Sequence, residues 1–330
     1  MRVLITGGTG FIGAPLTRGA LGRGWEVWVL TRRPDAPAAQ ALEAQGARLL
    51  GGDVTDAAAL RAAVDRAAPD VLFHNAGRYA IGLPRREARA MQRVNVEGTA
   101  RALAAAVAAG VHKVVYTSTA AVCGDTAGTL ADEGFERRSP PTSRYEASKA
   151  EAHALARQAQ RAGQPVVIVC PAQVVGPGDH SPFGWMARLY ARRLLPPVGW
   201  APESVFTFGH VDDVAEALLR AGEDGRPGET YFAAGEPLTV RETMALWAEA
   251  GRRGPPRLWL PRPLAMATAY AAHPLLHACG LPGFLSPEAV RSSYVSFRFS
   301  SEKIARALGV RFRPARQAWR EALEYARRRG

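Results

Sequence analysis

Tyr145 and Lys149 stand four residues apart in the stretch YEASK and are the strongest candidates for chemistry in the sequence. Residues at this spacing lie one turn apart on the same face of a helix. A free tyrosine, with a pKa of about 10, is a poor base near neutrality, whereas a neighbouring ammonium group favours the phenolate and lowers that pKa. The pair predicts a general acid/base, although the same spacing also occurs on ordinary surface helices.

Ser143 and Glu146 predict where this helix begins. They form an S-x-x-E pattern, which is typical of a capping box at a helix N-terminus. Tyr145 then becomes the second residue of the helix and points out of its first turn, an accessible place for an acid.

A glycine-rich turn, TGGTGFIG at 6–13, lies between a predicted strand, RVLIT, and a predicted helix. In this position missing side chains let a pyrophosphate approach backbone amides at the helix N-terminus. The alternative is a structural turn without a ligand. Two glycine spacings fit a dinucleotide motif, namely Gly8, Gly10 and Gly13, and Gly7, Gly10 and Gly13.

Arg32 and Arg33 follow the second predicted strand, WEVWVL, where an acidic residue would bind the ribose 2′-hydroxyl of NAD. A guanidinium group there pairs instead with the 2′-phosphate of NADP. We therefore predict NADP and regard NAD as the less favoured cofactor. Asp35 is the alternative NAD ligand, but it lies beyond Pro34 and outside the strand.

The elements that position these residues alternate between short apolar strands and alanine-rich helices. This order predicts an α/β fold with a Rossmann-type doubly wound parallel sheet and a smaller C-terminal substrate-binding lobe. We expect an NADP-binding domain at 1–175, with returning segments near 205–235. Residues 176–330 then form most of the substrate lobe, interleaved with the first domain.

The composition predicts a soluble globular protein, since 47% of the 330 residues are hydrophobic and 22% are charged. The net charge of +12 comes from arginines scattered along the chain rather than from a basic block. We therefore expect a small-molecule substrate and no nucleic-acid partner, with a preference for phosphate-bearing ligands.

Cys123, Cys170 and Cys279 are widely spaced and form no CxxC pattern, which predicts neither a disulfide framework nor a metal site and fits a cytoplasmic location. The segment 264–285 comes nearest to a membrane span, but His273, Pro274, His277 and two later glycines interrupt it. We expect a helix and loop packed on the protein rather than a membrane span.

Further motifs carry a resemblance to a known family. They are HNAG (74–77), NVEGT (95–99), YTSTAAVCG (116–124), PAQVVGPGD (171–179) and HVDDVA (210–215). Together with the glycine turn and YEASK, they make the chain similar to the extended short-chain dehydrogenase/reductase family of NAD(P)-dependent epimerases and dehydratases. The nearest subgroup resembles dihydroflavonol reductases and hydroxysteroid dehydrogenases.

The resemblance implies roles for individual residues. Thr119 orients the substrate oxygen beside Tyr145 and Lys149, with Ser118 as the second candidate; a strand-end hydroxyl bonded to backbone is the alternative for both. The implied cofactor-binding residues are Gly7, Thr9, Gly10, Phe11, Ile12, Gly13, Arg32, Arg33, Asp53, Val54, Ala76, Gly77, Asn95, Tyr145, Lys149, Pro171 and Val174. The implied substrate contacts are Ser118, Ala120, Gln173 and Trp185.

Departures from the family pattern narrow the reaction. Ala120 and Ala121 stand where dehydratases have an Asp-Glu pair, and the run 206–208 is Phe-Thr-Phe where nucleotide-sugar epimerases often have Arg-Asp-Phe. Cys170 replaces an arginine that is common in relatives, and Gln173 replaces an asparagine frequent in sugar enzymes. These differences favour a less charged substrate with a ketone or secondary alcohol.

The sequence thus predicts an NADP-dependent oxidoreductase that uses Tyr145, Lys149 and Thr119. One alternative is a nucleotide-sugar epimerase with tightly bound NAD(P), and another is an NADP-binding redox sensor without catalysis. By resemblance we also expect a homodimer that packs through helices at 85–109 and 145–161.

Overall fold

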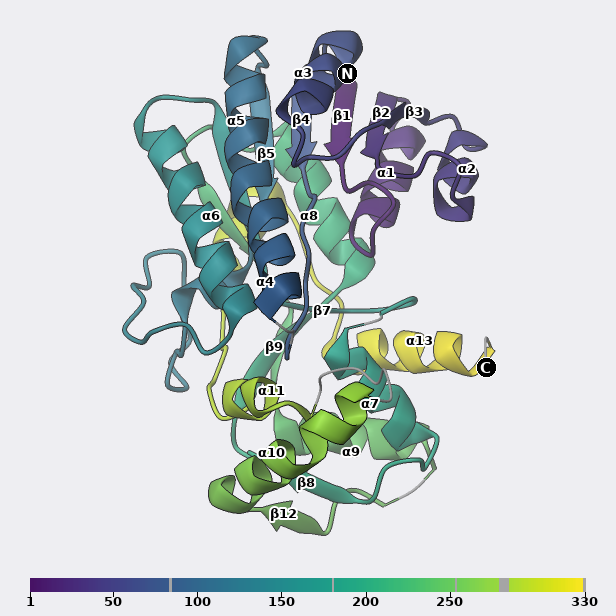
Figure 1. The fold of residues 1–330 in the computed structure, drawn as a ribbon, viewed down its shortest axis with the longest axis vertical. Helices are drawn as coiled ribbons and strands as arrows, with labels where there is room; N and C mark the ends of the chain where they lie inside the picture. Colours follow the sequence, from purple (N-terminus) through teal and green to yellow (C-terminus); the bar gives the residue numbers. More distant parts are fainter. Residues whose placement is uncertain (83–84, 180, 253, 279–284, 329–330) are drawn as a thin grey trace.

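The computed structural model of the chain describes residues 1–82, 85–179, 181–252, 254–278 and 285–328. A seven-stranded parallel sheet lies at its centre, in the order β10-β6-β5-β4-β1-β2-β3 (Figure 1). This arrangement confirms the predicted doubly wound fold. The strands are β1 Arg2–Thr6, β2 Glu26–Thr31, β3 Arg48–Gly51, β4 Val71–His74, β5 Lys113–Thr117, β6 Val166–Pro171 and β10 Thr230–Ala233.

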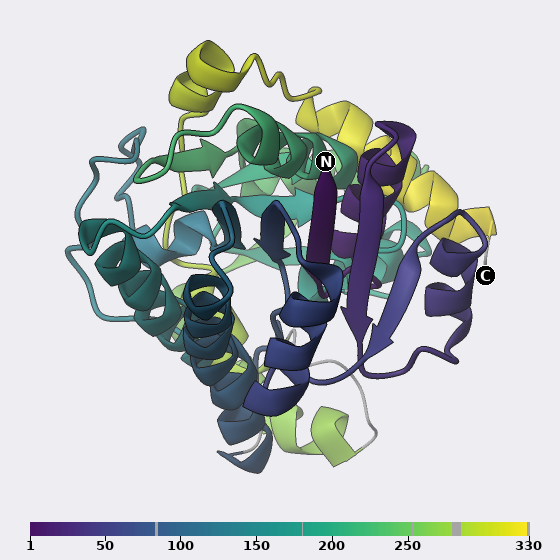
Figure 2. The same ribbon diagram turned by 90° about the horizontal axis from the view of Figure 1, so that it is seen from above.

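Helices cover both faces of this sheet (Figure 2). One face packs against α1 Gly13–Gly22, α2 Pro37–Glu43, α8 Val211–Glu223 and α12 Glu302–Leu308. The other face packs against α3 Ala57–Ala67, α5 Gly98–Ala108 and α6 Arg144–Arg161. Because both faces are buried, the strands are nearly continuous apolar runs, and β6 is buried along its whole length.

The helix expected at 85–109 is interrupted by a π-helical turn, Arg93–Glu97, between α4 Arg85–Gln92 and α5. Such turns are often found at functional sites. This one contains Asn95, and α6 packs beside it.

A smaller lobe lies beyond the carboxyl ends of the sheet strands (Figure 1). It contains a three-stranded sheet and a two-stranded pair, with a core centred on Phe208, Trp247 and Trp319. Its strands are β7 Gln173–Val175, β8 Val198–Trp200, β9 Val205–His210, β11 Glu236–Thr239 and β12 Leu258–Leu260. Its helices are α7 Pro182–Ala191, α9 Val240–Ala250, α10 Arg262–Ala278, α11 Pro287–Ser292 and α13 Ala315–Arg328.

The chain returns to the central sheet differently from our prediction. Helix α8 and strand β10 do return, but β9 pairs with β7 and β11 in the lobe instead. A strand's own residues do not specify which neighbour completes its hydrogen bonds.

The apolar segment that begins at Leu264 forms most of α10. Within the described residues, no helix is long and apolar enough to cross a membrane. Cys123 and Cys170 are buried free thiols, and Cys279 lies outside the described residues.

Candidate active site

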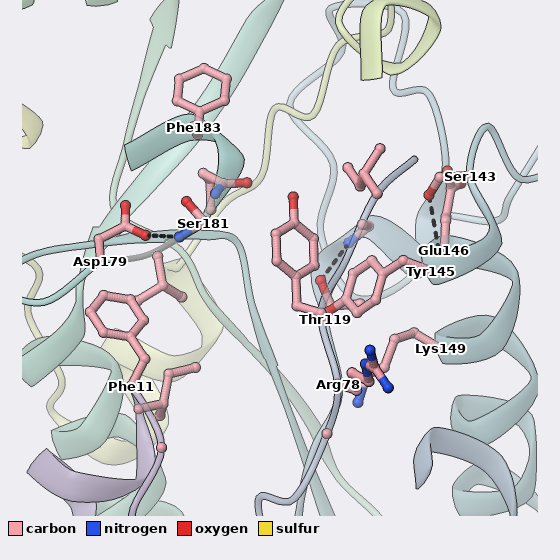
Figure 3. A pocket seen from close by; sticks show the side chains of 18 of the residues that line it. Phe11, Arg78, Thr119, Ser143, Tyr145, Glu146, Lys149, Asp179, Ser181 and Phe183 are labelled. Atoms are coloured by element: carbon pink, nitrogen blue, oxygen red, sulfur yellow. Dashed lines mark hydrogen bonds between the residues drawn. The ribbon is translucent and has the colours of Figure 1, made fainter. Parts of the chain in front are cut away.

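A cavity of about 1050 Å³ extends from the glycine turn, past the start of α6, into the smaller lobe. It opens along the carboxyl ends of β1, β2, β4 and β5, which is where ligands bind in open α/β sheets. Figure 3 shows Thr119, Tyr145 and Lys149 on one side of it and Phe11, Asp179 and Phe183 on the other.

At two positions of the glycine turn, neighbouring backbone atoms leave no room for a side chain. Gly7 has a φ of +71°, and a Cβ on it would lie 2.8 Å from the Ala76 Cα. A Cβ on Gly13 would lie 1.9 Å from the Gly7 carbonyl oxygen. The Gly10 amide donates to the same oxygen at 3.0 Å, so Gly7, Gly10 and Gly13 form the turn together.

The N-terminus of α1 fits a dinucleotide pyrophosphate. No side chain caps this helix among the described residues, and Gly10, Phe11 and Ile12 line the cavity at this end. Backbone N–H groups at an uncapped helix N-terminus, together with the helix dipole, bind anions. Thr9 also lines the cavity. Gly13 does not line it, but its missing side chain permits the close turn.

The residues predicted to bind the adenosine part of the cofactor lie at the other end of the cofactor region of the cavity, away from Tyr145. Asp53 and Val54 line the cavity, and Asp53 Oδ1 accepts hydrogen bonds from the backbone and hydroxyl of Thr55 at 2.8 and 2.9 Å. Arg32 and Arg33 lie directly after β2, line the cavity and are exposed. Neither of them forms an ion pair within the described ranges, so both guanidinium groups remain available to a phosphate.

Asp35 is exposed in the turn before α2 and does not line the cavity. The prediction that it lies outside the strand is confirmed.

Ser143 caps α6, as predicted, since its hydroxyl accepts a hydrogen bond from the Glu146 amide at 3.1 Å. Tyr145 is the second residue of the helix. The second half of the predicted capping box is wrong. The Glu146 carboxylate instead accepts from the Thr142 amide at 2.9 Å and from the Arg137 guanidinium at 2.6 Å.

Thr119 follows β5 and faces Tyr145 (Figure 3). Its hydroxyl donates to the Pro171 carbonyl at 3.4 Å and accepts from the Ala121 amide at 3.3 Å. The alternative interpretation, a strand-end hydroxyl bonded to backbone, therefore holds, and the substrate-orienting role of Thr119 stays a prediction.

Lys149 is held from below the cavity by two acceptors. Its ammonium group donates to the Thr117 carbonyl at 2.8 Å and to the Tyr116 hydroxyl at 3.2 Å. It also lies 4.8 Å from the centre of the Tyr116 ring, a cation–π contact. Because an ammonium group has three donors, one remains for the cavity.

The pKa of Tyr145 is raised from its ordinary value, because removal from water outweighs the lowering effects of the Lys149 charge and of the Thr119 hydroxyl. Burial likewise lowers the pKa of Lys149. The predicted effect of Lys149 on Tyr145 is therefore present, but the net direction is opposite to our expectation. Burial is a tertiary property that the YEASK spacing does not contain.

His74 extends the polar contacts beneath the site, and no sequence motif singled it out for this role. Its Nδ1 lies 2.9 Å from the Thr6 hydroxyl, its Nε2 lies 3.2 Å from the Thr99 hydroxyl, and its ring stacks on Tyr116. Burial, reinforced by the Lys149 charge, lowers the pKa of His74 to about 3, so the ring is neutral.

Asn95 supports the loop after β4, as the resemblance implies, without lining the cavity. Its amide group bonds the Arg78 amide at 2.8 Å, the Arg78 carbonyl at 3.0 Å and the Ser148 hydroxyl at 2.9 Å. Ala76 and Gly77 of this loop line the cavity. So does Tyr79, which was not predicted; its ring meets Tyr145 edge-on, with the ring centroids 4.6 Å apart.

Two predicted substrate contacts are not supported. Ala120 is fully buried in the apolar core behind the site, so it has no surface to offer a ligand. Trp185 does not line the cavity, because α7 presents other residues to it, including Met186 and Tyr190. Which face of α7 meets the cavity depends on how the helix packs, which the sequence does not specify.

The other predicted residues divide between the cavity wall and the layer behind it. Gln173 and Val174 line the cavity, whereas Pro171 is buried and supports Thr119 through its carbonyl. Ser118 also lines the cavity, but its hydroxyl lies 2.9 Å from His153 Nδ1, which favours Thr119 as the substrate-facing hydroxyl.

The part of the cavity in the smaller lobe is largely apolar. Among the described residues that line it from 172 to 297 there is no arginine or lysine, and the single carboxylate is that of Asp179. The apolar lining residues larger than alanine are Val174, Phe183, Met186, Tyr190, Leu195, Pro196, Val198, Trp200, Phe206, Val240, Met244, Trp247, Leu260, Leu285 and Phe297. In the ranges described, no group of three or more His, Cys, Asp or Glu side chains could hold a metal ion.

Comparison with known proteins agrees with this geometry. The model of the NAD dependent epimerase/dehydratase family matches residues 3–234. The 4-hydroxy-2-methyl-3-oxo-4-farnesyl-3,4-dihydroquinoline-1-oxide ketoreductase of Stigmatella aurantiaca is 31% identical, over 99% of this chain and 96% of the relative. Sterol demethylase protein B of Methylococcus capsulatus is also 31% identical, over 100% of this chain and 99% of the relative.

Among solved structures, UDP-glucose 4-epimerase of Thermus thermophilus, crystallised with NAD, is 27% identical. It superposes with a TM-score of 0.76, and the match covers 99% of each chain.

Proposed function

The chain belongs to the NAD-dependent epimerase/dehydratase family, and we propose that it is an NADP-dependent oxidoreductase acting on a ketone or secondary alcohol within a largely apolar molecule. The observation that carries the proposal is the cavity itself. It joins the glycine turn to Tyr145 and then to a lobe without cationic lining residues in its described part.

The residues of the glycine turn support a nicotinamide dinucleotide, since the turn is closely packed and the uncapped end of α1 suits a pyrophosphate. Arg32 and Arg33 support NADP, because two exposed guanidinium groups without ion-pair partners in the described ranges suit a 2′-phosphate. When bound, the cofactor supplies or accepts the hydride.

Three side chains take part in the proton transfer to the substrate oxygen. During reduction, Thr119 and Tyr145 hydrogen-bond the carbonyl oxygen, and Tyr145 donates its hydroxyl proton to that oxygen as the alcohol forms. The fixed positive charge of Lys149 stabilises the resulting phenolate. Two of its N–H groups already donate to Thr117 and Tyr116, so the third N–H group is left for the cavity.

A nucleotide-sugar epimerase is the second candidate, because a solved relative with that name has the same fold. Its substrate carries a diphosphate, and a buried diphosphate needs cationic or multiple N–H partners. The described lining of the lobe offers no arginine or lysine. The Stigmatella relative, whose named substrate carries a farnesyl chain and an oxo group, supports the oxidoreductase instead.

The test is NADPH oxidation with a panel of hydrophobic ketones and with UDP- and dTDP-sugars. We expect turnover with apolar ketones only, and a loss of at least a thousandfold in kcat for Tyr145→Phe with the NADPH dissociation constant unchanged. Tyr270→Phe is the matched control, because Tyr270 is 61% exposed on α10 and does not line the cavity. Full turnover by Tyr145→Phe, or epimerisation of a sugar nucleotide by enzyme that retains cofactor on gel filtration, contradicts the proposal.

A further inference from the structure

Glu288, in the first turn of α11, joins three segments that are far apart in the sequence. Its Oε1 accepts a hydrogen bond from the Arg144 amide at 2.6 Å, and its Oε2 accepts one from the Gly82 amide at 2.7 Å. Figure 1 shows α11 on the side of the smaller lobe that faces the lower end of α6. One carboxylate therefore connects the lobe to the start of α6 and to the loop after β4.

Both amide partners belong to segments that carry a tyrosine of the cavity. Arg144 is the first residue of α6 and directly precedes Tyr145. Its N–H is one of the amide groups that a helix leaves without an internal partner, and a carboxylate at this end is also favoured by the helix dipole. Gly82 lies three residues after Tyr79, whose ring packs edge-on against Tyr145.

A second contact from α11 reaches the same place. The Ser292 hydroxyl, one turn further along α11, lies 3.0 Å from the Thr142 hydroxyl. Thr142 in turn donates to the Glu146 carboxylate at 2.8 Å. The lobe is thus attached to the start of α6 on both sides of Tyr145, while Ala289 and Ser292 of α11 line the cavity.

We propose that Glu288 is a positioning residue that orients Tyr145 toward the substrate oxygen by holding the α6 N-terminus and the Tyr79 loop against the substrate lobe. The proposal rests on the proposed function of Tyr145. A carboxylate suits the role because both of its oxygens are acceptors, and each faces an N–H donor. An amide in the same place offers one acceptor, and its NH₂ group faces the other N–H.

Glu288→Gln is the principal test, with Glu288→Asp as the second variant. Glu288→Gln lowers kcat at least tenfold while the KM and dissociation constant for NADPH change less than twofold, because neither amide partner of Glu288 lies in the glycine turn or beside Arg32 and Arg33. Glu288→Asp keeps the charge but is one methylene shorter, so its kcat lies between those of the wild type and Glu288→Gln. Glu302→Gln is the control; Glu302 is an exposed carboxylate on α12 that pairs with Arg306.

Amide hydrogen exchange gives a readout that does not depend on the reaction. Exchange in peptides covering 78–82 and 142–147 becomes faster in both Glu288 variants and stays unchanged in Glu302→Gln. Unchanged kcat, or unchanged exchange in either peptide, overturns the proposal, as does a uniform increase in exchange across the chain. If wild-type enzyme reduces no ketone, the proposed function fails, while the exchange data still decide whether Glu288 holds these two segments.

Discussion

Replacing Gly13 by alanine tests whether the glycine turn depends on close backbone packing. The added Cβ would lie 1.9 Å from the Gly7 carbonyl oxygen and 2.8 Å from the Gly8 Cα, so the turn must move by about an ångström to relieve the overlap. Overpacking of this kind costs about 1–3 kcal/mol of the free energy of unfolding. Displaced amides also lose charge-assisted bonds to the pyrophosphate, each contributing about 1.5–3 kcal/mol, so we expect NADPH to bind at least tenfold more weakly.

Gly22→Ala is the matched control in the same helix. A Cβ on Gly22 meets no atom within 4 Å, and its φ is not in the left-handed region. Alanine at such a helix position is neutral or stabilises by up to about 1 kcal/mol. Urea unfolding and NADPH fluorescence titration measure both quantities. Wild-type NADPH affinity in Gly13→Ala, or equal losses in the two variants, refutes the reasoning.

Three further predictions concern the cofactor, the pH dependence and the loop after β4. Arg32→Ala and Arg33→Ala each weaken NADP⁺ binding about tenfold, with NAD⁺ binding unchanged, in calorimetric titrations; equal weakening of both cofactors excludes a 2′-phosphate contact. His74 has a pKa of about 3 in the folded protein and of about 6.5 in the unfolded chain. As the pH falls below 6.5, His74 therefore binds a proton in the unfolded chain but not in the folded protein. The free energy of unfolding therefore falls by about 1.4 kcal/mol per pH unit from this residue until pH approaches the lower of these values. Urea unfolding between pH 7 and 5 should show a shallower slope for His74→Gln, and an identical slope contradicts the assignment. Asn95→Ala removes the buried partners of the Arg78 backbone and costs about 2–3 kcal/mol in urea unfolding, with a reduced kcat; a loss below about 0.5 kcal/mol contradicts a supporting role.

The predictions that proved wrong share one cause. Glu146 bonds to Thr142 and Arg137 rather than to Ser143, and β9 pairs within the lobe. Ala120 turns into the core. For Tyr145 the predicted lowering of the pKa by Lys149 is present, but burial outweighs it. Each outcome depends on a neighbour or on burial that the local pattern does not specify. The contacts of Glu288 depend on distant neighbours in the same way, since its hydrogen-bond partners precede it by 144 and 206 residues.

The sequence by itself determined the elements whose physics is local. The glycine spacing, the Ser143 cap, the position of Tyr145 in its helix and the apolar strand runs depend on backbone conformation and on periodicity within a few residues, so they were predictable. Only the tertiary structure decided which acceptors hold Lys149 and which side chains form the apolar wall of the lobe. Those properties arise from packing and desolvation between segments, and such long-range contacts leave no pattern in the local sequence.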